Sequence, residues 1–176
     1  MAHNIFRIGV ISILLILGST WASSQSTFIK KIDKEEVIRA RQIVKYEDRI
    51  FIMNTGICNN LTECCTIMEI DEWGSLLWEQ RLPWLDVSSQ SMVVNNDTIF
   101  LSGNHNRTQR KFLFHQMSVD GGDSLATYDI VKPDDIYTNM FNLGMLRKEE
   151  KFLIYGTGYN NDQTEASSLI YEVDLY

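Results

Sequence analysis

The chain has 176 residues, of which 44% are hydrophobic and 22% are charged, and it carries 16 Lys and Arg against 23 Asp and Glu. A chain of this length and apolar content can bury one modest core, so we expect one compact domain, two at most, and not a disordered protein. The formal net charge of −7 excludes nucleic-acid binding through a basic footprint, and it excludes a polybasic membrane-surface role.

The segment 1–24 is predicted to be a signal peptide. An apolar run of eleven residues, 8–18, follows a short polar start with one positive charge. This run is too short to span a bilayer comfortably as a helix, but it has the length of a signal-peptide core. Ala22 and Ser24 are the small residues that a signal peptidase accepts, which places cleavage before Gln25. We expect a secreted or periplasmic chain with no membrane insertion after cleavage; the alternative is an uncleaved anchor.

Beyond residue 24, short β-rich runs alternate with turns that are rich in Asn, Asp, Gly and Ser, which is typical of antiparallel strands. The N-terminal segment 25–40 contains a candidate closing strand at 27–32. The only helix candidate covers 34–44, and its apolar positions fit a strand nearly as well. The predicted strands fall into three groups, which are 41–46, 49–55, 65–70 and 75–82; then 90–94, 98–102, 112–119 and 124–130; then 141–146, 151–155 and 168–173.

These groups form an internal repeat. One landmark is a glycine that ends a β-rich run, at Gly56, Gly103 and Gly156. The glycines are 47 and 53 residues apart (103 − 56 and 156 − 103). The second landmark is an aliphatic residue followed by Asp, at Asp71, Asp120 and Asp174. These are 49 and 54 residues apart (120 − 71 and 174 − 120). Both landmarks therefore give the same period to within two residues.

Each repeat predicts one unit of four antiparallel strands, and the third unit lacks its fourth strand. The Asp of each pair accepts hydrogen bonds from turn amides and the following Gly supplies positive φ, which closes a tight hairpin. The residues that we assign to the repeat turn are Asp71, Gly74, Trp78, Asp120, Gly122 and Asp174. Units of this length and content are typical of propeller blades, here at about 41–83, 89–131 and 140–176.

The stretch from Ile70 to Trp78 resembles the D-x-x-G-x-x-x-W turn of quinoprotein-like propellers (the PQQ-like repeat) in secreted bacterial proteins. The resemblance covers roughly residues 40–176, and its motif is weaker in the second unit and cut short in the third. It implies an all-β propeller fold in which Trp78 packs between blades. No cofactor-binding motif of that family is present, so the resemblance implies neither a cofactor nor catalytic residues.

The number of units predicts an incomplete propeller. Propellers close with about four to eight blades, and about three units would leave two apolar faces open. We expect the chain to be a fragment of a longer protein; the alternatives are self-association through the open faces and an open stack of sheets. The segment 27–32 is the candidate for the missing outer strand of the last blade.

Three cysteines, Cys58, Cys64 and Cys65, fall within eight residues. In an oxidising compartment we expect a disulfide from Cys58 to either Cys64 or Cys65, which would staple the hairpin between two strands of the first unit. Vicinal pairing of Cys64 with Cys65 is strained, and the spacing does not suit zinc.

The remaining polar candidates are better explained by structure than by chemistry. His105 is expected in a loop and His115 on a strand surface, and neither belongs to a nucleophile motif. The Asp120-Gly-Gly-Asp123 run invites a calcium hypothesis, but it lacks the EF-hand pattern and already explains a turn. We therefore predict no catalytic residue, no metal site and no cofactor.

Two classes of function follow. The first is a secreted, non-catalytic binding module whose partner is a protein or a glycan. Its candidate contact residues are Trp84, Tyr137 and Tyr159, since aromatic side chains anchor interfaces; the alternative is that they pack between blades. The second is part of a propeller-based enzyme, either a quinoprotein-like oxidoreductase or a hydrolase.

Overall fold

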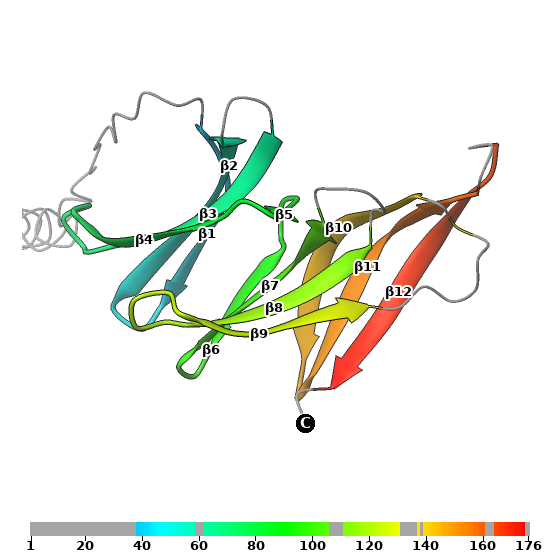
Figure 1. Ribbon diagram of the computed structural model, residues 1–176. Helices are drawn as coiled ribbons and strands as arrows, with labels where there is room; N and C mark the ends of the chain where they lie inside the picture. Colours follow the sequence, from blue (N-terminus) through cyan, green and yellow to red (C-terminus); the bar gives the residue numbers. More distant parts are fainter. Residues whose placement is uncertain are drawn as a thin grey trace, which may run out of the picture. The chain divides into compact units, whose positions relative to one another are not determined.

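The computed structural model describes residues 38–58, 62–105, 111–130, 137, 139–160 and 164–174. These residues form twelve strands in three sheets, and every pairing among them is antiparallel (Figure 1). The predicted all-β, antiparallel fold class is therefore confirmed. No helix in this part of the chain is long and apolar enough to cross a membrane. The predicted signal peptide and the candidate closing strand 27–32 lie outside the described residues.

The first sheet has the order β1-β2-β3-β4. Its strands are β1 (Ile38–Tyr46), β2 (Arg49–Cys58), β3 (Thr62–Ile70) and β4 (Leu76–Leu82). The helix candidate 34–44 is wrong for its described part, because residues 38–44 pair with β2 as a strand. Val44 and Tyr46 pack against the core while Ile43 is 65% exposed, which is the two-residue alternation of a strand.

The second sheet contains β5 (Leu85–Asp86), β6 (Met92–Asn95), β7 (Thr98–His105), β8 (Phe112–Ser118) and β9 (Ser124–Ile130). Both β5 and β6 pair with the same edge of β7, so they form one inner strand in two pieces. A Cβ on Gly103 would clash with the Asp86 carbonyl oxygen. Glycine at this position therefore lets the short β5 approach β7.

The third sheet has the order β10-β11-β12 within the described residues. Its strands are β10 (Asn139–Lys148), β11 (Lys151–Tyr159) and β12 (Ala166–Asp174). The landmark glycines do not end their strands as predicted, because each of the three lies inside the middle strand of its sheet. A Cβ on Gly156 would clash with the ring of Phe112 from the second sheet, so the glycine makes room for packing between sheets.

Two apolar cores join the sheets. The first core unites Phe51, Met53 and Ile67 of the first sheet with residues of the second such as Ile99 and Leu101. Because successive strand residues point to opposite faces, the other face of the second sheet builds the second core. This core joins buried residues of the second and third sheets, which are Phe100, Phe112, Phe114, Met140, Met145, Phe152, Ile154 and Leu169.

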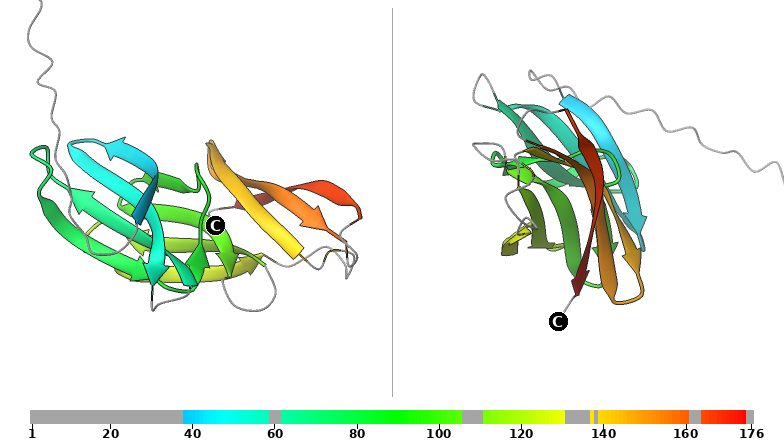
Figure 2. Two further views of the ribbon diagram at one scale, coloured as in Figure 1. Left: turned by 90° about the horizontal axis from the view of Figure 1, so that it is seen from above. Right: turned by 90° about the vertical axis from the view of Figure 1, so that its right-hand side faces the viewer.

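The second sheet is thus covered on both faces, one by each neighbouring sheet, as a blade in a propeller is. Figure 2 shows the same three sheets from two further sides. Each fully buried Phe, Leu or Ile in these cores contributes on the order of 1.5–3 kcal/mol to the free energy of unfolding. The fold is propeller-like, with a sheet in place of each predicted unit.

Candidate functional site

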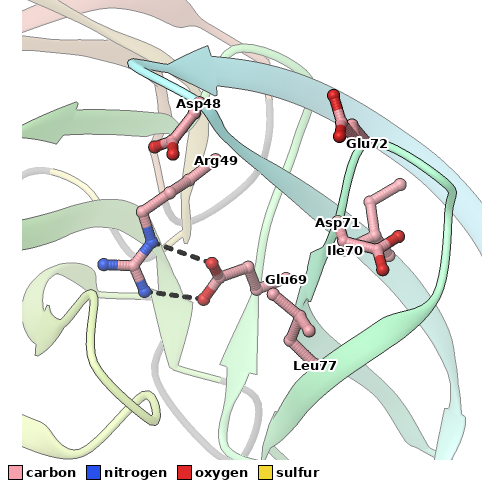
Figure 3. A pocket seen from close by; sticks show the side chains of 7 residues that line it. All are labelled: Asp48, Arg49, Glu69, Ile70, Asp71, Glu72 and Leu77. Atoms are coloured by element: carbon pink, nitrogen blue, oxygen red, sulfur yellow. Dashed lines mark hydrogen bonds and ion pairs between the residues drawn. The ribbon is translucent and has the colours of Figure 1, made fainter.

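A pocket of about 360 Å³ lies at one end of the first sheet, between the β1–β2 turn and the β3–β4 turn (Figure 3). Its lining residues are Asp48, Arg49, Glu69, Ile70, Asp71, Glu72 and Leu77. Successive turns of the antiparallel order β1-β2-β3-β4 alternate between the two ends of the sheet, so the first and third turns lie at the same end. Four of the seven lining residues are acidic and one is basic, so the pocket favours cationic groups or hydrogen-bond donors.

Arg49 forms the inner wall of the pocket and joins two sheets. Its Nε and Nη2 donate to the two carboxylate oxygens of Glu69 at 2.8 and 2.7 Å, as Figure 3 shows. Its Nη1 donates to Asp120 at 2.8 Å and its Nη2 to the Val119 carbonyl at 2.7 Å, both in the second sheet's β8–β9 connection. The hydrogen bond to Glu69 is the main cause that raises the pKa of Arg49. This guanidinium therefore neutralises the buried Glu69 and fastens the two sheets together.

The β3–β4 turn forms the outer wall and is rigid. The Asp71 carboxylate accepts hydrogen bonds from the amides of Trp73 at 2.9 Å and Ser75 at 2.6 Å. The Gly74 amide donates to the Asp71 carbonyl at 2.9 Å, and Gly74 has a φ of +74°, which glycine adopts without strain. Asp71 and Gly74 therefore close the turn and hold Trp73 at its tip.

Trp73 is 71% exposed, and the neighbouring Leu76 and Leu77 are 47% and 58% exposed. Trp73 is the largest of the exposed apolar side chains of this hairpin, and exposed apolar surface is one feature of interaction sites. Asp48 and Glu72 are also exposed, and neither makes a hydrogen bond or ion pair with another described residue. The pocket therefore offers two exposed carboxylates, and Trp73, which does not line it, is exposed at the tip of the adjoining turn.

The residues assigned to the second repeat turn contact the first sheet. Gly121 and Gly122 have φ of +78° and +72°. A Cβ on Gly122 would lie 2.7 Å from the ring of Trp78, which also packs against the first core. Trp78 thus contacts both the first core and the turn of the second sheet. In the third sheet, Asp174 is exposed and pairs with Lys151 at 3.4 Å.

The contact residues that the sequence suggests do not line this pocket. Trp84 packs against the first core and meets the ring of His115 edge-on at 5.0 Å. Tyr137 packs against the second core, and Tyr159 meets Phe141 edge-on at 5.5 Å. All three contact candidates are half-buried: Trp84 and Tyr137 pack against the two cores, and the ring partner of Tyr159 lies in its own sheet. Sequence reasoning missed Trp73 because it occupies a variable position of the turn motif.

His115 and Cys65 both lie inside the first core region. His115 is fully buried, so its expected place on a strand surface is wrong; the second sheet is covered on the face that His115 occupies. Its Nδ1 lies 2.8 Å from the Thr127 hydroxyl, and burial lowers its pKa. Cys65 is a free, fully buried thiol whose pKa is raised by burial. The pairing of Cys58 with Cys65 is therefore wrong, and the pairing with Cys64 stays a prediction.

The described residues contain no cluster of three or more side chains that could hold a metal ion. In the Asp120-Gly-Gly-Asp123 turn, the Asp120 carboxylate is bound by Arg49, and the Asp123 carbonyl accepts the Ser118 amide at 2.8 Å. The Asp120 carboxylate is thus part of the fold, and Asp123 contributes to the turn through its backbone.

No protein-family model matches the chain, and no curated protein matches it. Among solved structures, the chain is similar to a subtype N10 neuraminidase-like protein of A/little yellow-shouldered bat/Guatemala/060/2010, with 10% sequence identity and a TM-score of 0.34. The match covers 78% of this chain and 66% of the neuraminidase-like protein, so this chain spans less than two thirds of that protein's length. A likeness this weak says nothing about function, and the quinoprotein-like type of repeat stays a prediction.

Proposed function

We propose that this chain is a secreted, non-catalytic propeller-like module that binds a partner through the pocket beside Trp73. The observation that carries the proposal is the exposed Trp73, 71% accessible, on a turn fixed by four hydrogen bonds. A rigid aromatic residue loses little conformational entropy on binding, and Trp is enriched among the residues that dominate binding energy.

The charge of the pocket selects the class of ligand. Asp48 and Glu72 provide two exposed carboxylates in the pocket, and Trp73, which follows Glu72 in the turn, adds an exposed indole whose face attracts cations. The Arg49 guanidinium does not oppose such a ligand, because Glu69 and Asp120 neutralise it. A protein segment rich in Lys or Arg therefore fits best, and the net charge of −7 would speed its association. A glycan is the second class, since a sugar ring offers an apolar face and hydroxyl donors.

Secretion and the quinoprotein-like type of repeat rest on the sequence. Their support is the apolar run 8–18 before small residues, and the D-x-x-G-x-x-x-W spacing from Asp71 to Trp78. The alternative function, part of a quinoprotein-like oxidoreductase or a hydrolase, has no geometric support among the described residues. Cofactor absorbance and a calcium-dependent melting temperature in the folded protein would favour the oxidoreductase.

The test is an array of basic peptides, acidic control peptides and glycans, probed with the wild-type protein and two variants. We expect basic peptides to bind, more weakly at higher salt, and Trp73→Ala to weaken binding at least tenfold, which is about 1.4 kcal/mol. Leu125→Ala is the matched control, because Leu125 is 56% exposed on β9 and does not line the pocket. Binding that Trp73→Ala leaves unchanged would contradict the proposal.

A further inference from the structure

The third sheet exposes a face that both preceding sheets bury. The strands β2, β7 and β11 occupy equivalent places in the three sheets, and each pairs with the strand that follows it. The fifth residue of each of these strands forms the pairs Met53 with Ile67, Ser102 with Phe114, and Tyr155 with Ile170. Ile67 is 0% exposed in the first core and Phe114 is 1% exposed in the second. Ile170, at the same position of the third sheet, is 72% exposed.

The strands β1, β6 and β10, on the other edge of β2, β7 and β11, show the same difference in exposure. The third residue of β2, β7 and β11 pairs with Val44 in the first sheet, Val93 in the second and Leu146 in the third. Val44 packs against the first core and Val93 against the second, whereas Leu146 is 56% exposed. Leu146 pairs with the half-buried Leu153, and Ile170, which pairs with Tyr155, lies diagonally to Leu153 on the same face. These three residues define the third-sheet outer face.

An ion pair at the edge of this face follows the same pattern. Arg49 and Lys151 each begin a middle strand, and they pair with the equivalent carboxylates of Glu69 and Glu172. The Glu69 side chain is 5% exposed because the turn of the next sheet covers it, and this turn supplies the Asp120 carboxylate and the Val119 carbonyl to Arg49. The side chains of Lys151 and Glu172 are 49% and 53% exposed.

We propose that the third-sheet outer face is the docking surface for a fourth blade of the same repeat, carried by the same polypeptide beyond Tyr176. This fourth blade would form the same kind of interface that joins the first sheet to the second and the second to the third. In both of these, the equivalent face receives aliphatic or aromatic side chains from the next sheet. A turn of the fourth blade would bring an acidic side chain and a carbonyl to Lys151, as the β8–β9 turn does to Arg49.

A second copy of the chain that docks through the free face of its first sheet, the face opposite the first core, suits this face less well. On that face Met68 and Ile70 are already 3% and 9% exposed, although Ile43 is 65% exposed. A copy docking there would add little burial of apolar surface beyond Ile43.

The test is native thiol labelling of the full-length gene product. Ile170→Cys is compared with Leu125→Cys, which replaces another exposed residue outside this face; the native Cys65 is buried. In the full-length product we expect Ile170→Cys to react with a maleimide at least tenfold more slowly than Leu125→Cys. In the 176-residue chain we expect similar rates, and after unfolding the two rates should be equal in both proteins.

Three results would overturn the proposal. The first is rapid labelling of Ile170→Cys in the full-length product. The second is a gene that stops after the Tyr176 codon. The third is protection in the 176-residue chain that rises with protein concentration together with a dimer mass, which would assign the face to a second copy. Because Ile170 is exposed, its replacement leaves the fold of the 176-residue chain intact.

Discussion

Replacing Ile67 or Ile170 with Ala in the 176-residue chain tests the assignment of the two faces. The two residues occupy equivalent positions and undergo the same chemical change, but Ile67 is fully buried and Ile170 is 72% exposed. Truncating a buried Ile to Ala costs about 2–5 kcal/mol through lost burial and the cavity left behind. A surface substitution of this kind stays within about 0.5 kcal/mol.

Urea unfolding followed by circular dichroism measures both effects. With a urea dependence of about 2 kcal/mol per molar, Ile67→Ala should lower the midpoint by about 1–2.5 M, and Ile170→Ala should leave it nearly unchanged. A loss above about 1.5 kcal/mol for Ile170→Ala would show that its face is already covered. A loss below about 1 kcal/mol for Ile67→Ala would refute the shared core between the first two sheets.

Three further predictions concern the cores and the turns. Burial lowers the pKa of His115 below 6.5 in the folded state, so the unfolded chain binds more protons at acid pH. This contribution to the free energy of unfolding is therefore lost as pH falls below about 6.5. Between pH 7.5 and pH 5, the free energy of unfolding measured with urea should fall less steeply for His115→Gln than for the wild type, with a difference of at most about 1.4 kcal/mol per pH unit. Gly121→Ala and Gly122→Ala both place a side chain at positive φ, but only the second meets an indole ring, so calorimetry should show Gly122→Ala to be the more destabilising by about 1–3 kcal/mol; equal melting temperatures would contradict that packing. Peptide mapping without reduction should recover Cys58 linked to Cys64, and a peptide with both thiols alkylated before reduction would exclude this bond.

The strands could be predicted from the sequence because their signals are local. Alternation of apolar residues and Asp-Gly punctuation located three groups of strands, and the pairing registers bear these out. The two-residue β5 (Leu85–Asp86) was missed, since so short a strand has no periodicity. Gly103 and Gly156 were interpreted as strand ends, whereas they lie inside strands where another sheet or strand approaches closely. Such an approach depends on residues far away in the sequence.

The candidate site could not be predicted because it depends on which aromatic residues the fold leaves uncovered. Trp73 and Trp78 lie on one hairpin, five residues apart, and both carry the same large, mostly apolar side chain. Trp78 is half-buried because it packs against the first core and against Gly122 of the next sheet, whereas Trp73 is 71% exposed. His115 is a similar case, since its burial follows from a neighbouring sheet and not from its own strand.

The most direct test of the binding site is the indole NMR spectrum of the ¹⁵N-tryptophan-labelled protein, titrated with the tightest peptide from the array. The signals of Trp73, Trp78 and Trp84 are assigned by single substitution to Phe. We predict that the Trp73 signal shifts with a saturating dependence on peptide concentration, while the signals of the half-buried Trp78 and Trp84 stay in place. A shift of the Trp84 signal with Trp73 unchanged would contradict the account and move the site to the contact residues suggested by the sequence.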